Sequence, residues 1–237
     1  MELNSVLNTI VFGDAHGFAT AVKRGILLAE ELACKAIFLG DYVDRGPASL
    51  ETLRLLIKAK KNHPDWVFLR GNHDQMLLNL IHNKAKLDDQ EIALNRYLFC
   101  YSDCENTLEE LKQISDLERL EIVQFLEATI AYTEDQSFIY CHAILRDTNE
   151  PLENKTLEEW IWNYDYKPTW KGKTFIHGHL PCNKVTFKSK GININTKCGY
   201  GGVLTGLYFN NKIGIDEHTI FSISEDGEEL KRKKSID

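Results

Sequence analysis

Residues 40–46 read Gly40-Asp41-Tyr42-Val43-Asp44-Arg45-Gly46 and follow directly after the apolar run of residues 36–39. A short run of this kind, with β-branched and aromatic members, is typical of a buried parallel strand, so Asp41 is predicted to lie where that strand ends. In open α/β sheets this edge is where ligands bind. Carboxylates bind hard metal ions and an arginine can clamp a phosphate with two hydrogen bonds, so the stretch predicts a site for a metal and a phosphate.

The same pattern occurs twice more in the first third of the chain. The apolar run of residues 9–12 ends in Gly13-Asp14-Ala15-His16-Gly17, and residues 66–69 run into Arg70-Gly71-Asn72-His73-Asp74. Helical periodicity over residues 19–33 and 50–57 separates the three runs, which predicts βαβ units with neighbouring parallel strands. A turn needs only Gly, Asn or Asp, so the added histidines and arginine indicate a functional site at the strand ends.

The rest of the chain is predicted to complete one α/β domain over residues 1–237. Residues 77–133 have long helical patterns and are interpreted as a helical insertion, whose acidic residues, including Asp88, Asp89, Glu109 and Glu110, form a solvated face. Residues 137–140 and 173–176 are predicted strands that end in Cys141-His142-Ala143 and His177-Gly178-His179. Short strands over residues 184–223 suggest an antiparallel second sheet, and the polar tail from residue 225 to 237 is expected to be frayed.

Composition excludes several classes of protein. A chain of 237 residues with 43% hydrophobic content can bury one sizeable core. The net charge of −7 argues against non-specific nucleic-acid binding, and the basic run of residues 231–234 is interpreted as solvated tail. No apolar run has membrane-spanning length and the start lacks a signal-peptide pattern, so we expect a cytoplasmic protein with no membrane partner.

The six cysteines are scattered, with no C-x-x-C pair, and are interpreted as reduced thiols. Cys100 and Cys104 are interpreted as two small residues on one helix, in preference to a metal or redox pair.

Oxygen and imidazole donors from five strand ends form the candidate metal site. No thiolate is among them, which favours first-row divalent ions such as Mn, Fe or Zn over a closed cysteine site. Asp41, in the middle strand position, is the natural bridge between two ions. The candidate ligands are Asp14, His16, Asp41, Asn72, His142 and one of the pair His177 and His179.

These motifs resemble those of the metallophosphoesterases, in particular the phosphoprotein phosphatase branch, which includes Ser/Thr protein phosphatases and diadenosine tetraphosphate hydrolases. The resemblance rests on Gly-Asp-Ala-His-Gly, Gly-Asp-Tyr-Val-Asp-Arg-Gly, Arg-Gly-Asn-His-Asp, His142-Ala143 and Gly178-His179, in that order. It implies a four-layer αββα sandwich with a helical insertion, and two divalent metal ions, with Mn²⁺ the first choice and Fe or Zn as alternatives.

The resemblance also implies residue roles. One metal would be held by Asp14, His16 and Asp41, and the second by Asp41, Asn72, His142 and His179, while His177 can line the site without being a ligand. A metal-bridging hydroxide would attack phosphorus. His73 would give a proton to the leaving oxygen, Asp44 would stabilise the protonated imidazole, and Arg45 and Arg70 would neutralise the phosphate oxygens.

Two departures from the family pattern concern the substrate. Tyr164 stands where many relatives have a phosphate-contacting arginine, and Arg146 is a candidate substitute for it. Asn195 and Lys197 stand where relatives have aspartate and glycine. Tyr164 in the place of an arginine is expected to raise KM, and Tyr164→Arg to lower it.

Three functions are compatible with this pattern. Few basic residues fall near the motifs, which favours a phosphomonoesterase acting on Ser/Thr phosphoproteins, because a dinucleoside polyphosphate needs cations for several phosphates. The alternatives are a diadenosine tetraphosphate hydrolase, with a phosphorylated small molecule as substrate, and a catalytically silent protein that binds a phosphorylated partner.

Overall fold

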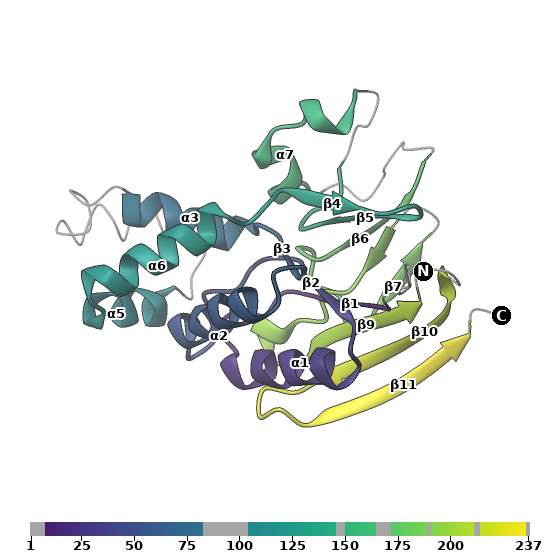
Figure 1. The fold of residues 1–237 in the computed structure, drawn as a ribbon, viewed down its shortest axis with the longest axis horizontal. Coiled ribbons are helices and arrows are strands. Elements are labelled where there is room, and N and C mark those ends of the chain that lie inside the picture. The colour runs from purple at the N-terminus through teal and green to yellow at the C-terminus, as the bar shows by residue number, and fades with distance from the viewer. Residues whose placement is uncertain are drawn as a thin grey trace, which may run out of the picture.

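The computed structural model describes residues 8–82, 104–145, 150–164, 172–188, 191–210 and 214–235. Two sheets lie face to face, and helices lie on their outer sides (Figure 1). The candidate residues Cys100 and Arg146, and the acidic pair Asp88 and Asp89, lie outside the described residues.

The first sheet has the strand order β11-β10-β9-β1-β2-β3. Its parallel half comprises β1 (Thr9–Phe12), β2 (Lys35–Phe38) and β3 (Val67–Phe68), connected by α1 (Ala19–Glu31) and α2 (Ser49–Asn62) as the βαβ pattern predicted. Its antiparallel half comprises β9 (Leu204–Asn210), β10 (Gly214–Ile223) and β11 (Glu229–Ser235).

The second sheet has the order β4-β5-β6-β8-β7. Its members are β4 (Tyr132–Glu134), β5 (Phe138–Cys141), β6 (Thr174–His177), β7 (Thr186–Lys188) and β8 (Gly191–Asn193). β5, β6 and β8 are parallel, and the two outer strands are antiparallel to their neighbours. The expectation that the strands after residue 184 form a separate antiparallel sheet is therefore wrong. They divide between both sheets, because β9 pairs with the edge of β1 and β8 with the edge of β6.

Three apolar clusters fill the spaces between four layers. Successive residues of a strand face opposite sides of a sheet, so Ile10 and Phe12 pack against the helices while Val11 packs against the second sheet. On the far side of the second sheet, Phe175 packs with Trp160 of α7 (Leu157–Ile161). This arrangement confirms the four-layer αββα sandwich.

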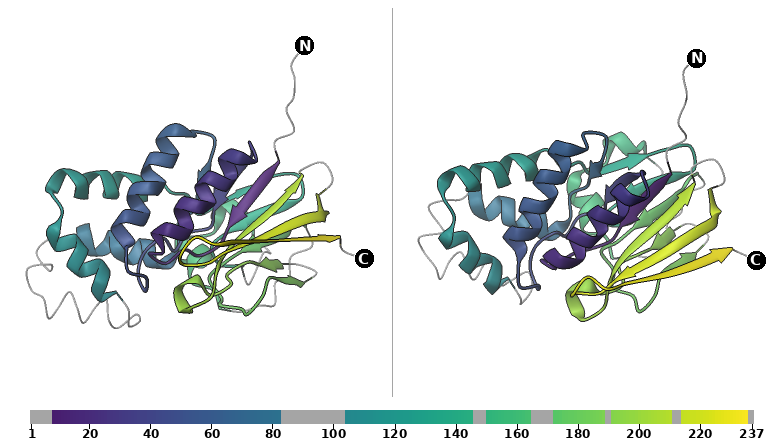
Figure 2. Two further views of the ribbon diagram at one scale, coloured as in Figure 1. Left: turned by 90° about the horizontal axis from the view of Figure 1, so that it is seen from below. Right: turned by 60° about the horizontal axis from the view of Figure 1, so that its bottom comes forward.

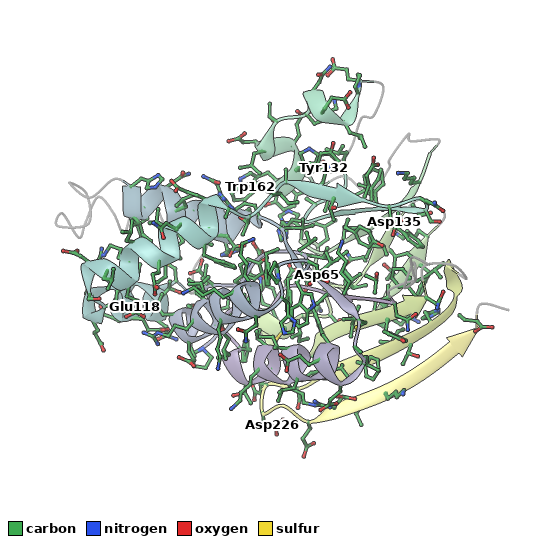
Figure 3. All side chains as sticks on the ribbon, in the orientation of Figure 1. Asp65, Glu118, Tyr132, Asp135, Trp162 and Asp226 are labelled. Atoms are coloured by element: carbon green, nitrogen blue, oxygen red, sulfur yellow. The ribbon has the colours of Figure 1, made fainter. Side chains whose placement is uncertain are left out.

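A helical layer flanks the sheets on the side of α2, away from β9–β11 (Figure 2). It consists of α3 (Asn72–His82), α5 (Glu105–Gln113) and α6 (Asp116–Glu127), and Glu118 lies towards its outer end (Figure 3). α3 begins at Asn72, five residues before the expected start of the insertion, so the third strand-end motif opens directly into a helix.

The interpretation of Glu110 as a solvated residue is wrong, because this side chain caps a neighbouring helix. α2 has no cap of its own at Ala48, and the Glu110 carboxylate accepts hydrogen bonds from the backbone N–H groups of Ser49 at 3.0 Å and Leu50 at 2.9 Å. A carboxylate at a helix N-terminus satisfies unpaired donors and stabilises the helix dipole. The helical layer is thereby connected to the loop that carries Asp44 and Arg45.

The C-terminal tail also departs from expectation. Instead of fraying after residue 225, the chain forms β11, which pairs with β10 from Glu217↔Ser235 to Ile223↔Glu229 and ends the first sheet. The basic run of residues 231–234 therefore lies on an edge strand.

Two further findings concern the whole described chain. The five cysteines within it are free thiols. No helix in these ranges combines the length and apolar character that crossing a membrane requires.

Replacing Glu110 by alanine should destabilise the protein, because two N–H groups at the start of α2 lose their acceptor. We expect Glu110→Ala to lower the free energy of unfolding by about 1–2 kcal/mol in urea titrations. Glu109→Ala is the matched control: Glu109 is exposed and pairs with Lys112 on the surface, so its loss should cost less than about 0.5 kcal/mol. Equal effects of the two substitutions would contradict the capping role.

Candidate metal centre

Polar residues that directly follow five strands lie close together between the two sheets. Asp14 follows β1, Asp41 follows β2 and Asn72 follows β3, all from the first sheet, while His142 follows β5 and His179 follows β6. These residues lie where the sheets meet the helical layer, since Asn72 is also the first residue of α3 (Figure 1). Each of the five residues is less than 10% exposed.

On one side of this centre, hydrogen-bond acceptors converge. The His142 ring donates from Nδ1 to the backbone oxygen of Leu39 at 3.0 Å, so its neutral form has a lone pair on Nε2. That atom lies 3.0 Å from Oδ1 of Asn72, 3.2 Å from Nδ1 of His179 and 3.4 Å from Oδ2 of Asp41. Burial lowers the pKa of His142, and it lowers the pKa of His179 to about 3, so both rings stay neutral. The four atoms are Nε2 of His142, Oδ1 of Asn72, Nδ1 of His179 and Oδ2 of Asp41, and with neutral rings at most one of them carries a proton. Their lone pairs therefore point at one another, and a cation bound among them would satisfy them.

On the other side, Asp41 faces a second imidazole pair. The His16 ring donates from Nδ1 to the backbone oxygen of Val43 at 3.0 Å, which leaves Nε2 facing Oδ2 of Asp41 at 3.6 Å. Burial lowers the pKa of His16 well below its usual value. Donor atoms of His16, Asp41 and His73 lie within 4.8 Å of one another, as do those of Asp41, His142 and His179. Asp41 belongs to both groups, so its carboxylate lies between the two pairs of imidazoles.

Asp14 belongs to neither of these two groups. Its carboxylate is held by hydrogen bonds from neighbouring N–H groups. Its Oδ2 accepts from the Asn195 side-chain amide at 2.5 Å and from the backbone N–H of His179 at 3.1 Å. Burial, then the charge of Asp41, raises the pKa of Asp14 well above its usual value. Burial would also raise the pKa of Asp41, but the surrounding histidines outweigh it and lower that pKa. Two buried carboxylates that repel one another favour a bound cation.

A histidine and a carboxylate form a second functional unit next to these donors. The His73 ring donates from Nδ1 to Oδ2 of Asp44 at 2.7 Å, and its Nε2 lies 3.1 Å from a guanidinium nitrogen of Arg45. Burial lowers the pKa of His73, but the charge of Asp41 and the hydrogen bond to Asp44 outweigh it, so the net pKa is raised. Arg45 also contacts Nε2 of His16. The unit therefore offers a proton donor and a cation side by side.

The backbone of the site is strained. Seven non-glycine residues of the described chain have positive φ, and five of them belong to the site: His16, Asp41, Asp44, Arg45 and His179. A left-handed conformation costs a non-glycine residue about 1–2 kcal/mol, so the surrounding structure must stabilise it.

Asp74 supplies much of that support for the Asp41 loop. Its fully buried carboxylate accepts from the backbone N–H groups of Asp41 at 2.8 Å, Tyr42 at 2.9 Å and Gly71 at 2.9 Å. A side chain at Gly71 would place its Cβ 2.2 Å from Oδ1 of Asp41, so only glycine fits there. The Asp41 carboxylate is thus positioned by the hydrogen bonds of its own backbone and by close packing against Gly71.

Comparison with known proteins identifies the family of this site. A family model for calcineurin-like phosphoesterases matches residues 7–206, which includes every strand-end motif described above. The chain belongs to the calcineurin-like phosphoesterase family. It is therefore a phosphoester hydrolase, and the alternative of a silent binding protein is set aside. The family uses divalent metals, which agrees with the converging lone pairs and neutral imidazoles around Asp41.

Relatives share sequence with most of this chain, and solved structures share its fold. The asymmetrical bis(5′-nucleosyl)-tetraphosphatase PrpE of Halalkalibacterium halodurans is 28% identical over 195 residues, which cover 73% of this chain and 74% of the relative. A crystal structure provisionally classed as a diadenosine tetraphosphatase has a TM-score of 0.63 at 19% identity, covering 97% of this chain and 95% of its own. A protein serine/threonine phosphatase from Saccharomyces cerevisiae has a TM-score of 0.60 at 15% identity, covering 100% of this chain and 82% of its own.

The Arg70 side chain makes its hydrogen bonds with the helical layer. Its guanidinium group donates to the side chains of Thr129 and Gln75 and to the backbone oxygen of Leu126, and the residue is 5% exposed. These partners belong to α3, to the last turn of α6 and to the turn that follows α6. Arg70 thus connects β3 to the helical layer, and these contacts engage its guanidinium group.

Two other candidates lie close to the donors. Tyr164 is 54% exposed and its ring lies 4.7 Å from that of His179, so it lies at the rim of the site. His177, at the end of β6, is fully buried and its Nδ1 donates to the backbone oxygen of Gly178. His177 is in neither of the two compact donor groups.

Sequence reasoning assigned no role to three residues that shape the site. Asp74 stood inside a recognised motif, and an acidic residue in the first turn of a helix was the available signal. Asn195 was noted only as a departure from the family, although its amide holds Asp14. Tyr200 lies between Gly199 and Gly201, at the end of a short 3₁₀ helix (Cys198–Tyr200). The centroid of its ring lies 4.3 Å from the Arg45 guanidinium carbon.

Removing the Asn195 amide should weaken metal binding, because Asp14 then loses the donor that orients its carboxylate. Groups that orient a metal ligand typically contribute 10- to 100-fold in affinity, so we expect Asn195→Ala to weaken Mn²⁺ binding by about 10-fold or more in calorimetric titrations of chelated protein. Asn183→Ala removes an exposed amide of the loop between β6 and β7, which contacts Lys197, and should leave affinity unchanged. Unchanged affinity in Asn195→Ala would show that Asp14 needs no such support.

Proposed function

We propose that this phosphoester hydrolase uses two divalent metal ions to cleave dinucleoside polyphosphates. The convergence of buried donors on Asp41, next to the His73–Asp44 pair and Arg45, supports the two-metal chemistry. The substrate class is supported by the similarity to bis(5′-nucleosyl)-tetraphosphatases over nearly three quarters of the chain. This choice favours the alternative that sequence analysis left open over its first expectation, a phosphoprotein.

The proposed ligands keep the two groups that the family resemblance implied. Asp14, His16 and Asp41 would hold one ion, and Asp41, Asn72, His142 and His179 the other, with Mn²⁺ as the first candidate. The mixed carboxylate, amide and imidazole set fits such ions. Bound there, they would supply positive charge for the phosphate oxygens and acidify a water for attack on phosphorus.

The roles of the remaining site residues follow from their contacts. Arg45 reaches both the His16 and His73 rings, so it lies where a phosphate approaching the donors would find a cation. His73 would give its Nε2 proton to the leaving oxygen as the phosphorus–oxygen bond breaks. Asp44 lies 2.7 Å from Nδ1 of His73 and keeps the proton on that nitrogen. Its carboxylate also stabilises the positively charged imidazole until Nε2 gives up its proton.

A Ser/Thr phosphoprotein phosphatase is the second candidate, and one observation favours it. Arg70 is engaged by the helical layer, so Arg45 is the arginine that the described part of the site offers to a phosphate. One arginine can bind one phosphate group, which suits a substrate with a single phosphate. A chain of phosphates would have to be held by the metal ions and by groups beyond the described residues.

A substrate panel distinguishes these candidates. With Mn²⁺ present, we expect kcat/KM for diadenosine tetraphosphate to exceed that for a series of Ser/Thr phosphopeptides and for an aryl phosphate by at least about tenfold. Phosphate and nucleotide release can be measured separately by chromatography. A phosphopeptide that reacts far faster than the dinucleotide would reverse the order of the two proposals.

Replacing His73 by asparagine should slow esters with poor leaving groups most, because these depend on protonation of the leaving oxygen. We expect His73→Asn to lower kcat on an alkyl phosphate by about 10²–10⁴-fold, and to affect an aryl phosphate less. Metal content, measured by atomic emission, serves as the control and should stay close to that of the unmodified protein. Equal losses on both esters, or loss of metal, would reassign His73 to a structural or ligand role.

A further inference from the structure

Two exposed aromatic side chains contact the site. Among the exposed aromatic residues of the described ranges, Tyr164 is 54% exposed, Tyr200 is 52% exposed and Phe187 is 37% exposed. The tyrosines contact His179 and Arg45, whereas Phe187 contacts His218, which is not a site residue. Aromatic rings left in water at the rim of a polar site are typical of places where a planar ligand binds.

The two tyrosines are the end members of one series of contacts that passes through the centre. A continuous series of contacts runs from Tyr200 to the Arg45 guanidinium, at 4.3 Å from the ring centroid, and from Arg45 to His16. Asp41 then joins the His16 side to the His142 side, at 3.6 and 3.4 Å. The series ends with the His142 and His179 rings, 5.0 Å apart, and the ring of Tyr164, 4.7 Å from His179.

The loop that carries Tyr200 is held in place by its backbone. The N–H groups of Tyr200 and Gly202 both donate to the backbone oxygen of Lys197 at 2.8 Å. A side chain at Gly199 would place its Cβ 2.7 Å from Cδ2 of His16, so this loop packs directly on a site residue. The ring of Tyr200 is therefore positioned before any ligand arrives, which lowers the entropic cost of binding.

The segment that carries Tyr164 is anchored as well. It follows α7, which begins with a capping box between Thr156 and Glu159 and buries Trp160 against the ring of Tyr132 at 4.3 Å. Asn163 donates to the backbone oxygen of Ile144. Trp162, two residues before Tyr164, lies where α7 meets β4 and the helical layer (Figure 3), with its ring 6.4 Å from that of His179.

We infer that Tyr164 and Tyr200 are two base-stacking platforms that bind the two nucleobases of a dinucleoside polyphosphate on opposite sides of the metal centre. The inference rests on the proposed function and deepens it. Such a substrate has planar bases at both ends and anionic phosphates between them, and the site has aromatic rings at both ends and metal donors with Arg45 between them. On Tyr200, a base stacked on the face away from Arg45 would continue a stack of guanidinium, phenol and base.

Binding of a non-hydrolysable, methylene-bridged analogue of diadenosine tetraphosphate tests the inference. Titrations use the Mn²⁺-loaded protein and the variants Tyr164→Leu and Tyr200→Leu. Stacking of one base is worth a factor of about 5 to 150, so each variant should weaken binding by that factor, and the double variant by about their product. Tyr164→Phe and Tyr200→Phe keep the rings and should bind within about twofold of the unmodified protein. Phe187→Leu, an exposed aromatic away from the site, should have no effect.

Tripolyphosphate, which has no bases, separates stacking from other roles of the tyrosines. Its affinity should be unchanged in both leucine variants. Equal losses for tripolyphosphate and the dinucleotide would overturn the inference and show that Tyr200 only positions Arg45, or that Tyr164 only positions His179. Undiminished dinucleotide binding by the leucine variants would overturn it too.

The substrate panel keeps failure of this inference distinct from failure of the proposed function. If the unmodified protein hydrolyses diadenosine tetraphosphate while the leucine variants bind the analogue normally, only the stacking role fails. If the unmodified protein neither binds nor hydrolyses dinucleotides and prefers phosphopeptides, the proposed function fails and the inference fails with it.

Discussion

The burial of the Asp41 carboxylate is the constraint on which the site depends. A buried carboxylate is costly unless it is paired, and Asp41 sits at the end of β2 with imidazoles on both sides. Its backbone has positive φ, and Asp74 stabilises that conformation through three N–H groups of the neighbouring loops. Because Asp41 lies in both donor groups, the position of one side chain determines whether the two halves of the centre face each other.

The helical layer stabilises the same site through hydrogen bonds to the loop that carries Asp44. Ser49, at the start of α2, accepts from the backbone N–H of Asp44 at 2.9 Å and hydrogen-bonds Thr107 of α5 at 2.8 Å. Glu110, one turn further along α5, caps the helix that Ser49 opens. Arg70 connects β3 to the end of α6. The inserted helices are thus connected to the His73–Asp44 pair through two hydrogen bonds, one between Thr107 and Ser49 and one between Ser49 and Asp44. These helices therefore help to position the site.

Discrimination between phosphoesters depends on the rim of the site more than on its centre. Buried donors around Asp41 can serve any phosphoester, so they do not distinguish a phosphopeptide from a dinucleotide. The residues that we propose for this role are exposed and lie outside the strands, Tyr164 after α7 and Tyr200 in the short connection before β9. Such loops vary readily on a constant scaffold, which is the physical reason that one family acts on different phosphoesters.

The sequence by itself determined the fold class and the position of the donors. Each motif follows an apolar run, and parallel strands end at one edge of a sheet, so the order of the motifs was enough to bring Asp14, Asp41 and Asn72 together. Only the tertiary structure decided where long side chains point and what loops and edges do. Arg70 is near the site in sequence but is bound by Thr129 of a distant segment, and Glu110 caps a helix sixty residues away. The basic tail forms β11 because β10 offers it a free edge. Periodicity reports only local structure, whereas these roles depend on partners that the chain brings together when it folds.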